Sequence, residues 1–299
     1  MSERRRHALI VNPSSGGGRG GRTLPDVEAL MRERGVAFRT VVSTGLRDGI
    51  DQALAAHDDG EIPVVMSGDG LIGQVGGALA EREATMGILP GGRGNDFARV
   101  LGIPSELEGA VEVLANGAAR EIDVGEVNGK RFLGIASTGF DSVANRTANE
   151  TRLVRGGLVY TYAALRTLAS WRPATFTVTL DGAETYTVSG YGVAVANNRA
   201  FGGGMFIAPD AELDDGRFDV VSSGHVGKLR FLSNLPKVFK GTHVDEDEVT
   251  VRRAATVEVS ADRAFPVYAD GEHLSDLPAR LRVLERALRV LAPGDDAGL

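Results

Sequence analysis

The first 125 residues alternate between two kinds of segment, and this alternation constrains the fold more than any other feature of the chain. Short apolar segments rich in β-branched residues lie at residues 7–12, 36–44, 62–68 and 85–91. Segments with helical patterning follow them in turn, at residues 23–35, 49–60, 72–83 and 95–102. Strands that alternate with helices build a parallel sheet covered by helices on both faces. The sequence therefore predicts an α/β domain over residues 1–125.

After Asp123 the pattern changes. Short β-branched segments separated by turn residues now follow one another, at residues 131–140, 175–182, 184–197, 217–224, 256–261 and 266–272. This succession predicts an antiparallel β-sandwich domain over residues 126–299, interrupted by a helical segment near residues 150–170. Residues 279–293 fit either two strands or one amphipathic helix, and as strands they could return to the first domain.

Composition excludes several classes of function. The chain of 299 residues has no cysteine, which rules out disulfides and a thiol nucleophile, and its five histidines lack the spacing of zinc ligands. A net charge of −7 argues against general nucleic-acid binding. No segment approaches the roughly 20 apolar residues of a membrane-spanning helix, and no signal peptide is visible. We therefore expect a cytoplasmic protein that binds no nucleic acid and has no transmembrane segment.

Three glycine-rich stretches each follow a predicted strand. The first, SSGGGRGGR at residues 14–22, contains the spacing G-x-G-x-x-G. Four residues separate its first glycine from the strand, whereas a dinucleotide fingerprint needs a tight turn there. A flexible loop and a phosphate-binding loop fit this stretch equally well. The second and third stretches are Gly68-Asp69-Gly70 and GGRGND at residues 91–96.

The second and third stretches place carboxylates at one edge of the predicted sheet. The carboxyl ends of parallel strands carry the ligand sites of α/β sheets, and free backbone N–H groups in glycine turns can bind phosphate oxygens. Asp69 and Asp96 could there hold magnesium against nucleotide phosphates, directly or through water. Structural explanations are also open, because Asp-Gly is common in turns and Asn95 or Asp96 can cap the following helix.

Five motifs follow one another along nearly the whole chain. They are NPSSG at residues 12–16, SGDG at 67–70, GRGNDFARVLGIP at 92–104, FGGGMFIAPDAELDDGRFDVV at 201–221 and YADGE at 268–272. In this order they resemble the bacterial diacylglycerol kinase family of lipid kinases, whose relatives include sphingosine and ceramide kinases. The resemblance implies a nucleotide-binding first domain, a lipid-substrate second domain, and transfer of the γ-phosphate of Mg·ATP to a lipid hydroxyl, with diacylglycerol converted to phosphatidate.

The resemblance also implies roles for particular residues. The ATP-binding residues it implies are Asn12, Pro13, Ser14, Ser15, Gly16, Thr44, Ser67, Gly68, Asp69, Gly70, Leu71, Gln74, Gly92, Arg93 and Asn95. Asp69, Asp96 and Asp123 would organise the catalytic magnesium. A second, structural magnesium would take the carboxylate of Asp215 and the carbonyls of Glu212 and Arg217. Asp270 or Glu272 would be the catalytic base, presented to the nucleotide by the second domain, although Asp-Gly in YADGE is also an ordinary hairpin turn.

The sequence departs from the family pattern around the ATP loops. Ser67 and Leu71 replace the usual outer residues of Gly-Gly-Asp-Gly-Thr, Gly73-Gln74 stand where Asn-Glu is usual, and Arg93 replaces a threonine. Two hydroxyls that could contact phosphate are therefore missing, although Arg93 could pair with phosphate instead. Two alternatives stay open: another kinase of this architecture, similar to NAD kinases or sphingoid-base kinases, and a catalytically weak protein that binds a nucleotide or a lipid.

Residues 145–172 form a basic segment in an acidic chain. They contain five arginines and one glutamate, interspersed with aromatic and leucine side chains. Basic and aromatic surfaces bind anionic headgroups, so the segment could place the protein on the inner face of the membrane, beside its lipid substrate. An ordinary helix packed on the sandwich explains most of the apolar residues as well. Because the family often dimerises, a homodimer is compatible with the resemblance.

Overall fold

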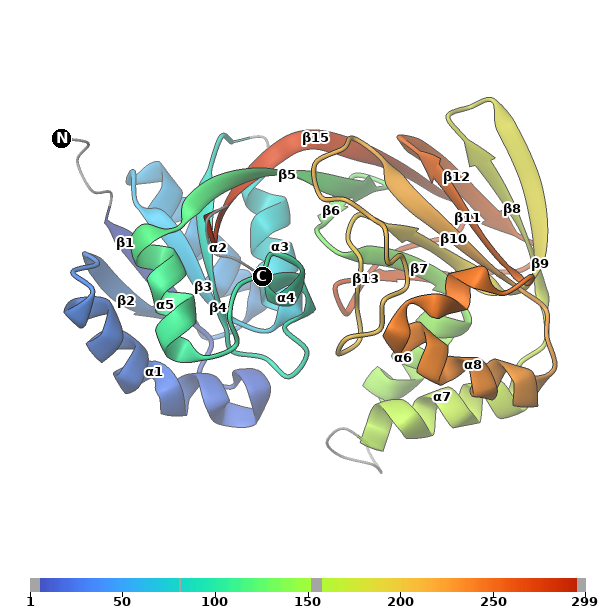
Figure 1. The fold of residues 1–299 in the computed structure, drawn as a ribbon, viewed down its shortest axis with the longest axis horizontal. Helices are drawn as coiled ribbons and strands as arrows, with labels where there is room; N and C mark the ends of the chain where they lie inside the picture. The colour runs from blue at the N-terminus through green and yellow to red at the C-terminus, as the bar shows by residue number, and fades with distance from the viewer. Residues whose placement is uncertain (1–5, 81, 152–157, 295–299) are drawn as a thin grey trace. The chain divides into compact units, whose positions relative to one another are not determined.

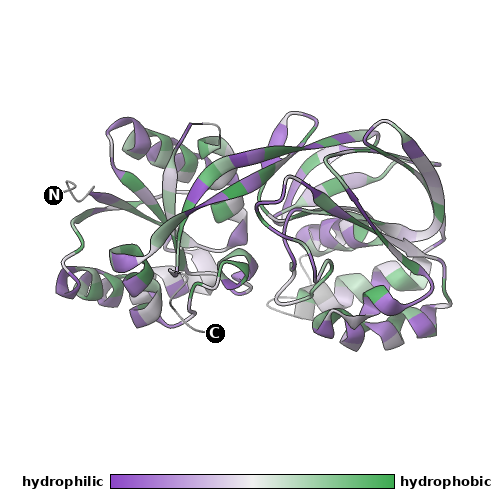
Figure 2. Cartoon of the chain, turned by 45° about the horizontal axis from the view of Figure 1, so that its top comes forward, coloured by the Kyte–Doolittle hydropathy of each residue, from purple (hydrophilic) through white to green (hydrophobic). Residues whose placement is uncertain are grey.

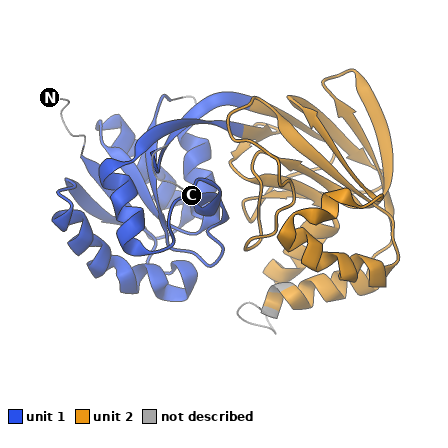
Figure 3. Cartoon of the chain, in the orientation of Figure 1, with its two compact units in different colours: residues 1–124, 284–299 blue, residues 125–283 orange. Residues whose placement is uncertain are grey.

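The computed structural model describes residues 6–80, 82–151 and 158–294. The chain forms two compact units, which Figure 3 colours separately: unit 1 comprises residues 1–124 and 284–299, and unit 2 comprises residues 125–283. The parallel sheet of the first part of the chain and the antiparallel strands of the second part are both as predicted. Within the described residues, no helix is both long enough and apolar enough to cross a bilayer.

Unit 1 is built on a parallel sheet with the strand order β4-β3-β1-β2. Its strands are β1 (His7–Val11), β2 (Phe38–Val42), β3 (Ile62–Ser67) and β4 (Thr85–Pro90). Every residue of β1 is buried, and so are five of the six residues in each of β3 and β4. Continuous apolar runs of this kind are typical of strands covered by helices on both faces.

Helices flank the sheet of unit 1. They are α1 (Ser15–Glu33), α2 (Leu46–Asp58), α3 (Asp69–Leu79), α4 (Asp96–Val100) and α5 (Leu107–Asn116). α1 packs beside α5, and α2 packs beside α3 (Figure 1). The helix predicted at 23–35 in fact begins near residue 19, after three glycines with positive φ, and Pro25 lies inside it. The prediction missed α5, which buries the apolar face Ala110, Val111, Val113 and Leu114.

Unit 2 consists mainly of antiparallel strands. They are β5 (Ala118–Val127), β6 (Lys130–Phe132), β7 (Ile135–Gly139), β8 (Ala174–Leu180), β9 (Glu184–Ala196), β10 (Phe218–Gly224), β11 (Val249–Ala254), β12 (Thr256–Ala261), β13 (Pro266–Ala269), β14 (Glu272–Asp276) and β15 (Ala279–Ala292). β5 and β15 also contribute residues to unit 1. Phe132, Phe176 and Phe218 are fully buried in the core that these strands share.

The ambiguous run near the end of the chain is the single strand β15. In unit 2, residues 279–282 pair with β12, whereas in unit 1 Arg289 and Val290 pair with β4 in the parallel sense. The last residues of the strand, Leu288 to Ala292, are mostly buried. The core of unit 1 therefore includes residues that are distant in sequence from the rest of the unit.

Helices also accompany the strands of unit 2. They are α6 (Phe140–Glu150), α7 (Leu158–Ser170) and α8 (Lys228–Lys240), and α8 is followed by a 3₁₀ turn at Thr242–Asp245. α6 and α7 correspond to the helical segment predicted near residues 150–170, although 152–157 lie outside the described residues. The sequence prediction missed α8, along which hydrophobic and hydrophilic residues alternate (Figure 2).

Candidate active site

Three glycine-rich loops come together at the carboxyl ends of β1, β3 and β4. A Cβ atom on Gly16 would lie 2.6 Å from the carbonyl oxygen of Gly91, and one on Gly92 would lie 2.5 Å from Cα of Gly68. Gly91 N–H donates to the carbonyl of Ser67 at 2.9 Å. Only glycine permits backbones to approach this closely, so the three stretches singled out in the sequence form one backbone cradle.

The first loop turns around the side chain of Asn12. Its Oδ1 accepts hydrogen bonds from the backbone N–H of Ser14 at 3.1 Å and from the Ser14 hydroxyl at 2.7 Å. The next residues, Gly16 to Gly18, have φ values of 59°, 72° and 88°. This left-handed stretch turns the chain into α1, and the guanidinium of Arg93 lies beside Gly17.

Two donor-bearing side chains of the predicted ATP-binding set lack partners among the described residues. Ser15 Oγ and Gln74 Nε2 are buried, and neither has a hydrogen bond to any residue that the structure describes. Buried polar groups are normally satisfied, so the unpaired hydroxyl of Ser15, within the first glycine loop, fits a site for an anionic ligand.

Asp69 and Asp96 lie at the starts of two neighbouring helices. Asp69 begins α3, and its Oδ1 accepts the backbone N–H of Phe97 at 3.1 Å. Burial raises the pKa of Asp69, and the nearby negative charge of Asp96 raises it further. Asp96 is 6% exposed, and its Oδ1 accepts a hydrogen bond from Arg99 at 2.6 Å. Two close carboxylates repel each other, and a divalent cation would relieve that repulsion.

Asp123, the third predicted magnesium residue, is fully buried in β5. Its Oδ1 accepts the backbone N–H of Arg286 at 2.8 Å, which ties β5 to β15. Among the described residues, no three acidic or histidine side chains are placed so as to hold a metal ion by themselves. Magnesium in nucleotide sites usually takes one or two carboxylates together with phosphate oxygens and water, and Asp69 with Asp96 fits that pattern.

Other residues predicted to bind ATP already make contacts within the protein. Leu71 is 6% exposed and lies against Gly49 of α2, so its side chain belongs to the core. The backbone N–H and hydroxyl of Thr44 both donate to Asp48, at 2.7 and 3.0 Å. Asn95 has φ of 52°, and its Oδ1 accepts the N–H of Gly92 at 2.8 Å. Asn95 therefore shapes the third loop.

In unit 2, Asp270 is bound to the backbone. Asp270 and Gly271 have φ of 52° and 83° and form the tight turn between β13 and β14. Asp270 Oδ2 accepts Leu133 N–H and Oδ1 accepts Gly134 N–H, each at 2.9 Å. A Cβ on Gly134 would lie 2.3 Å from Asp270 Oδ1, so a glycine is needed there. The carboxylate fixes this turn onto the start of β7.

Glu272 follows the same turn and is differently placed. Its side chain is exposed and forms no hydrogen bond with any residue that the structure describes. Neighbouring protein atoms that exclude part of its hydration water nevertheless raise the pKa of Glu272. A carboxylate with a raised pKa and open lone pairs is a better proton acceptor than one already occupied by two N–H donors.

The residues predicted to hold a structural magnesium lie in the loop before β10. Asp215 Oδ1 accepts the N–H of Arg217 at 3.0 Å, and Asp215 Oδ2 forms an ion pair with Arg253. Arg253 also lies 3.7 Å from the carboxylate of Asp219. A cation bound by Asp215 would therefore share this carboxylate with the Arg253 guanidinium.

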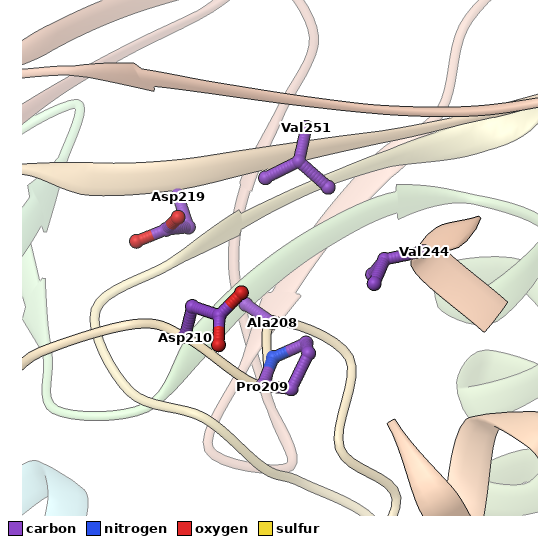
Figure 4. Close-up of a pocket in the computed structure, with 6 residues that line it drawn as sticks. All are labelled: Ala208, Pro209, Asp210, Asp219, Val244 and Val251. Atoms are coloured by element: carbon purple, nitrogen blue, oxygen red, sulfur yellow. The ribbon is translucent and has the colours of Figure 1, made fainter. Parts of the chain in front are cut away.

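A cavity of about 300 Å³ lies next to this loop and involves none of the predicted site residues. It is lined by Ala208, Pro209, Asp210, Asp219, Val244 and Val251 (Figure 4). Burial raises the pKa of Asp219 to about 6, and the charges of Asp210 and Glu212 contribute to the rise.

Sequence reasoning missed the partners that hold the predicted residues. Arg99 on Asp96 could have been found, because Asp and Arg three residues apart in a helix lie on one side. Leu133 and Gly134, which donate to Asp270, act through their backbone and carry no side-chain signal. The same holds for Arg286, whose N–H binds Asp123.

The chain is similar to known proteins over nearly its whole length. Residues 6–127 match the model of the diacylglycerol kinase catalytic domain, and residues 134–292 match that of the YegS C-terminal NAD kinase beta sandwich-like domain. A diacylglycerol kinase of Mycobacterium tuberculosis is 35% identical over 301 residues, a match that spans 97% of each chain.

Solved structures show the same fold. A diacylglycerol kinase from Bacillus anthracis has a TM-score of 0.75 at 20% identity, with 98% of both chains covered. An NAD kinase from Archaeoglobus fulgidus, solved in complex with ATP, has a TM-score of 0.51 at 15% identity, with 96% of this chain and 93% of the other covered. From the family models and the M. tuberculosis relative, the chain belongs to the bacterial diacylglycerol kinase family of lipid kinases.

Proposed function

We propose that this kinase transfers the γ-phosphate of Mg·ATP to the free hydroxyl of diacylglycerol and releases phosphatidate. The observation that carries the proposal is the cradle of three glycine loops with Asp69 and Asp96 beside it. Phosphoryl transfer depends on positioning and on neutralising charge, and backbone N–H groups with a carboxylate-bound cation supply both.

The proposed nucleotide site uses the residues of unit 1. The loop from Asn12 to Gly18 and the loop from Gly68 to Gly70 offer backbone N–H groups to the phosphates. Ser15, Gln74 and Arg93 would add side-chain donors, and Arg93 stands where the family pattern has a threonine. The ATP complex of an NAD kinase with this fold supports ATP as the donor.

Magnesium would be held by Asp69 and Asp96 together with phosphate oxygens. When bound, it would neutralise the negative charge that shifts between phosphate oxygens during transfer. Asp123, which the family resemblance adds to this magnesium network, also holds β5 against β15. The structural magnesium at Asp215, with the carbonyls of Glu212 and Arg217, remains a separate proposal. It would be supported by a rise in melting temperature with added magnesium that Asp215→Ala removes.

Unit 2 supplies the proton acceptor. In this proposal Glu272 removes the proton of the lipid hydroxyl as the oxygen attacks the γ-phosphate, while Asp270 positions the turn that carries Glu272. The new bond joins the lipid oxygen to phosphorus, the bond to the β,γ-bridging oxygen breaks, and ADP leaves.

The proposed function is tested by identifying which acceptor the protein phosphorylates. The purified protein is incubated with Mg·ATP and a panel of diacylglycerol, ceramide, a sphingoid base and NAD, and the products are identified by mass spectrometry. Phosphatidate formation supports the proposal. Phosphorylated NAD with no lipid product would assign the chain the reaction of its NAD kinase neighbour, and lipid binding without transfer would mark it as a binding protein.

A further inference from the structure

Helix α8 carries four large apolar side chains on its exposed side. Leu229 is 84% exposed, Phe239 47%, Leu235 41% and Leu232 38%. Steps of three, three and four residues keep these side chains on one side of a helix. No residue of α8 is fully buried. A surface helix normally turns its large apolar side chains toward the core, so four of them left exposed on one helix are unusual.

The opposite side of α8 is firmly attached to unit 2. The ring of Phe231 stacks on Tyr191 with centroids 3.9 Å apart and meets Phe140 edge-on at 5.0 Å. Arg230 and Asn234 donate to Glu248 at 2.9 and 3.1 Å. The helix is therefore held in one orientation by its other side, and the four apolar side chains are left facing outward.

The charge of α8 favours an anionic partner for this face over a neutral one. α8 contains four basic residues and no acidic one, in a chain of net charge −7. Arg230 and Lys237 are neutralised by Glu248 and Glu246. Lys228 and Lys240, at the two ends of the helix, pair with no acidic group among the described residues. Lys228 instead donates to the carbonyl of Ala169 in α7.

The end of α7 lies beside the start of α8. The bond between Lys228 and Ala169 joins α7 to α8, and Leu165, one turn before Ala169, is 51% exposed. α7 has no acidic residue in its sequence. Apolar side chains bordered by lysines are suited to a bilayer, in which leucine and phenylalanine enter the acyl boundary and lysine reaches the headgroups.

We infer that α8 is a membrane-docking helix, which inserts Leu229, Leu232, Leu235 and Phe239 into an anionic bilayer with Lys228 and Lys240 at headgroup level. The choice of a bilayer as the occupant rests on the proposed lipid substrate. Charge also favours it over a second copy of the chain, because a two-fold contact through this face would bring its unneutralised lysines together.

The test measures binding to vesicles in the absence of ATP and of diacylglycerol. Vesicles of phosphatidylcholine alone are compared with vesicles that also contain phosphatidylglycerol, by co-sedimentation. The double variant Leu229→Ser, Leu232→Ser should bind the anionic vesicles at least ~10-fold more weakly than the parent protein, since each leucine buries apolar area on insertion. Val42→Ser is the matched control, because Val42 is 56% exposed in unit 1. It should bind as the parent does.

Two results would overturn the inference. One is equal binding of the double variant and the parent to anionic vesicles. The other is a dimer in sedimentation velocity that the double substitution dissociates, which would assign the face to self-association. Kinase assays with diacylglycerol in detergent micelles separate this inference from the proposed function. The double variant should keep the parental rate there, whereas failure of the proposed function would abolish the rate in both proteins.

Discussion

At the scale of single residues, Asp270 and Glu272 are neighbours with different tasks. Glu272→Gln removes the proposed proton acceptor and should lower kcat by about 10²- to 10⁴-fold with little change in melting temperature.

Asp270→Asn places an amide against two N–H donors and should lower the free energy of unfolding by about 1–3 kcal/mol. Steady-state kinetics and calorimetry measure both effects. A full rate for Glu272→Gln would show that the base is elsewhere.

The stability of unit 2 should depend on pH because Asp219 titrates at different pH values in the folded and unfolded states. Its pKa in the folded protein is about 6, above the ordinary value of 3.8, because burial and the carboxylates of Asp210 and Glu212 disfavour its charge. Between these two values the folded state binds more protons than the unfolded state, so the free energy of unfolding falls as pH rises. The full effect is on the order of 2–3 kcal/mol.

Asp219→Asn removes this titration. Compared with the parent, the variant should therefore gain stability as pH is raised from 4 to 7, measured as the difference between their melting temperatures at each pH. The ion pair with Arg253 opposes the trend by favouring the charged carboxylate. A difference between the two proteins that stays constant over this range would contradict the assignment.

At the scale of elements, the glycine loops depend on close backbone contact. Gly92→Ala would place a methyl group 2.5 Å from Cα of Gly68 and 2.9 Å from Asn95 Oδ1. It should lower the free energy of unfolding by about 1–3 kcal/mol and raise the KM for ATP. Gly227→Ala is the control, because a Cβ there meets nothing within 4 Å and should change stability by less than about 0.5 kcal/mol. Equal effects of the two substitutions would show that the loops can separate.

The elements also show where sequence patterns suffice. The apolar runs of β1, β3 and β4 predicted their strands because buried parallel strands need continuous apolar sequence. The start of α1 was misplaced because Gly16 to Gly18 have left-handed φ values, which no sequence period encodes. α8 was missed although its apolar residues repeat with helical spacing, and Pro236 inside the helix is the residue that argues against a helix there.

At the scale of the whole molecule, β15 contributes residues to both units, and its second half belongs to the core of unit 1. Val290 is fully buried beside β4, and Val290→Ala should lower the free energy of unfolding of unit 1 by about 2 kcal/mol. Glu285→Ala on the same strand replaces an exposed side chain and should have an effect below about 0.5 kcal/mol. Thermal unfolding measures both, and equal losses would mean that β15 does not stabilise unit 1 through its buried face.

Some parts of the candidate site could be predicted from the sequence, and others could not. Gly-Asp-Gly and Gly-Gly-Arg-Gly-Asn-Asp could be placed at strand ends from the sequence, and the structure brings those loops together. The different roles of Asp270 and Glu272 were not predictable. They depend on backbone N–H groups that bind Asp270 and lie more than 130 residues before it in the sequence. The core position of the Leu71 side chain likewise depends on its packing against Gly49.

The central claim is that this chain moves phosphate from ATP to diacylglycerol with Glu272 as the proton acceptor. The most direct measurement follows γ-labelled ATP into diacylglycerol in detergent micelles, for the parent protein and for Glu272→Gln in parallel. The account predicts labelled phosphatidate from the parent and at least ~10²-fold less from the variant. No labelled lipid from the parent, or equal amounts from both proteins, would contradict it.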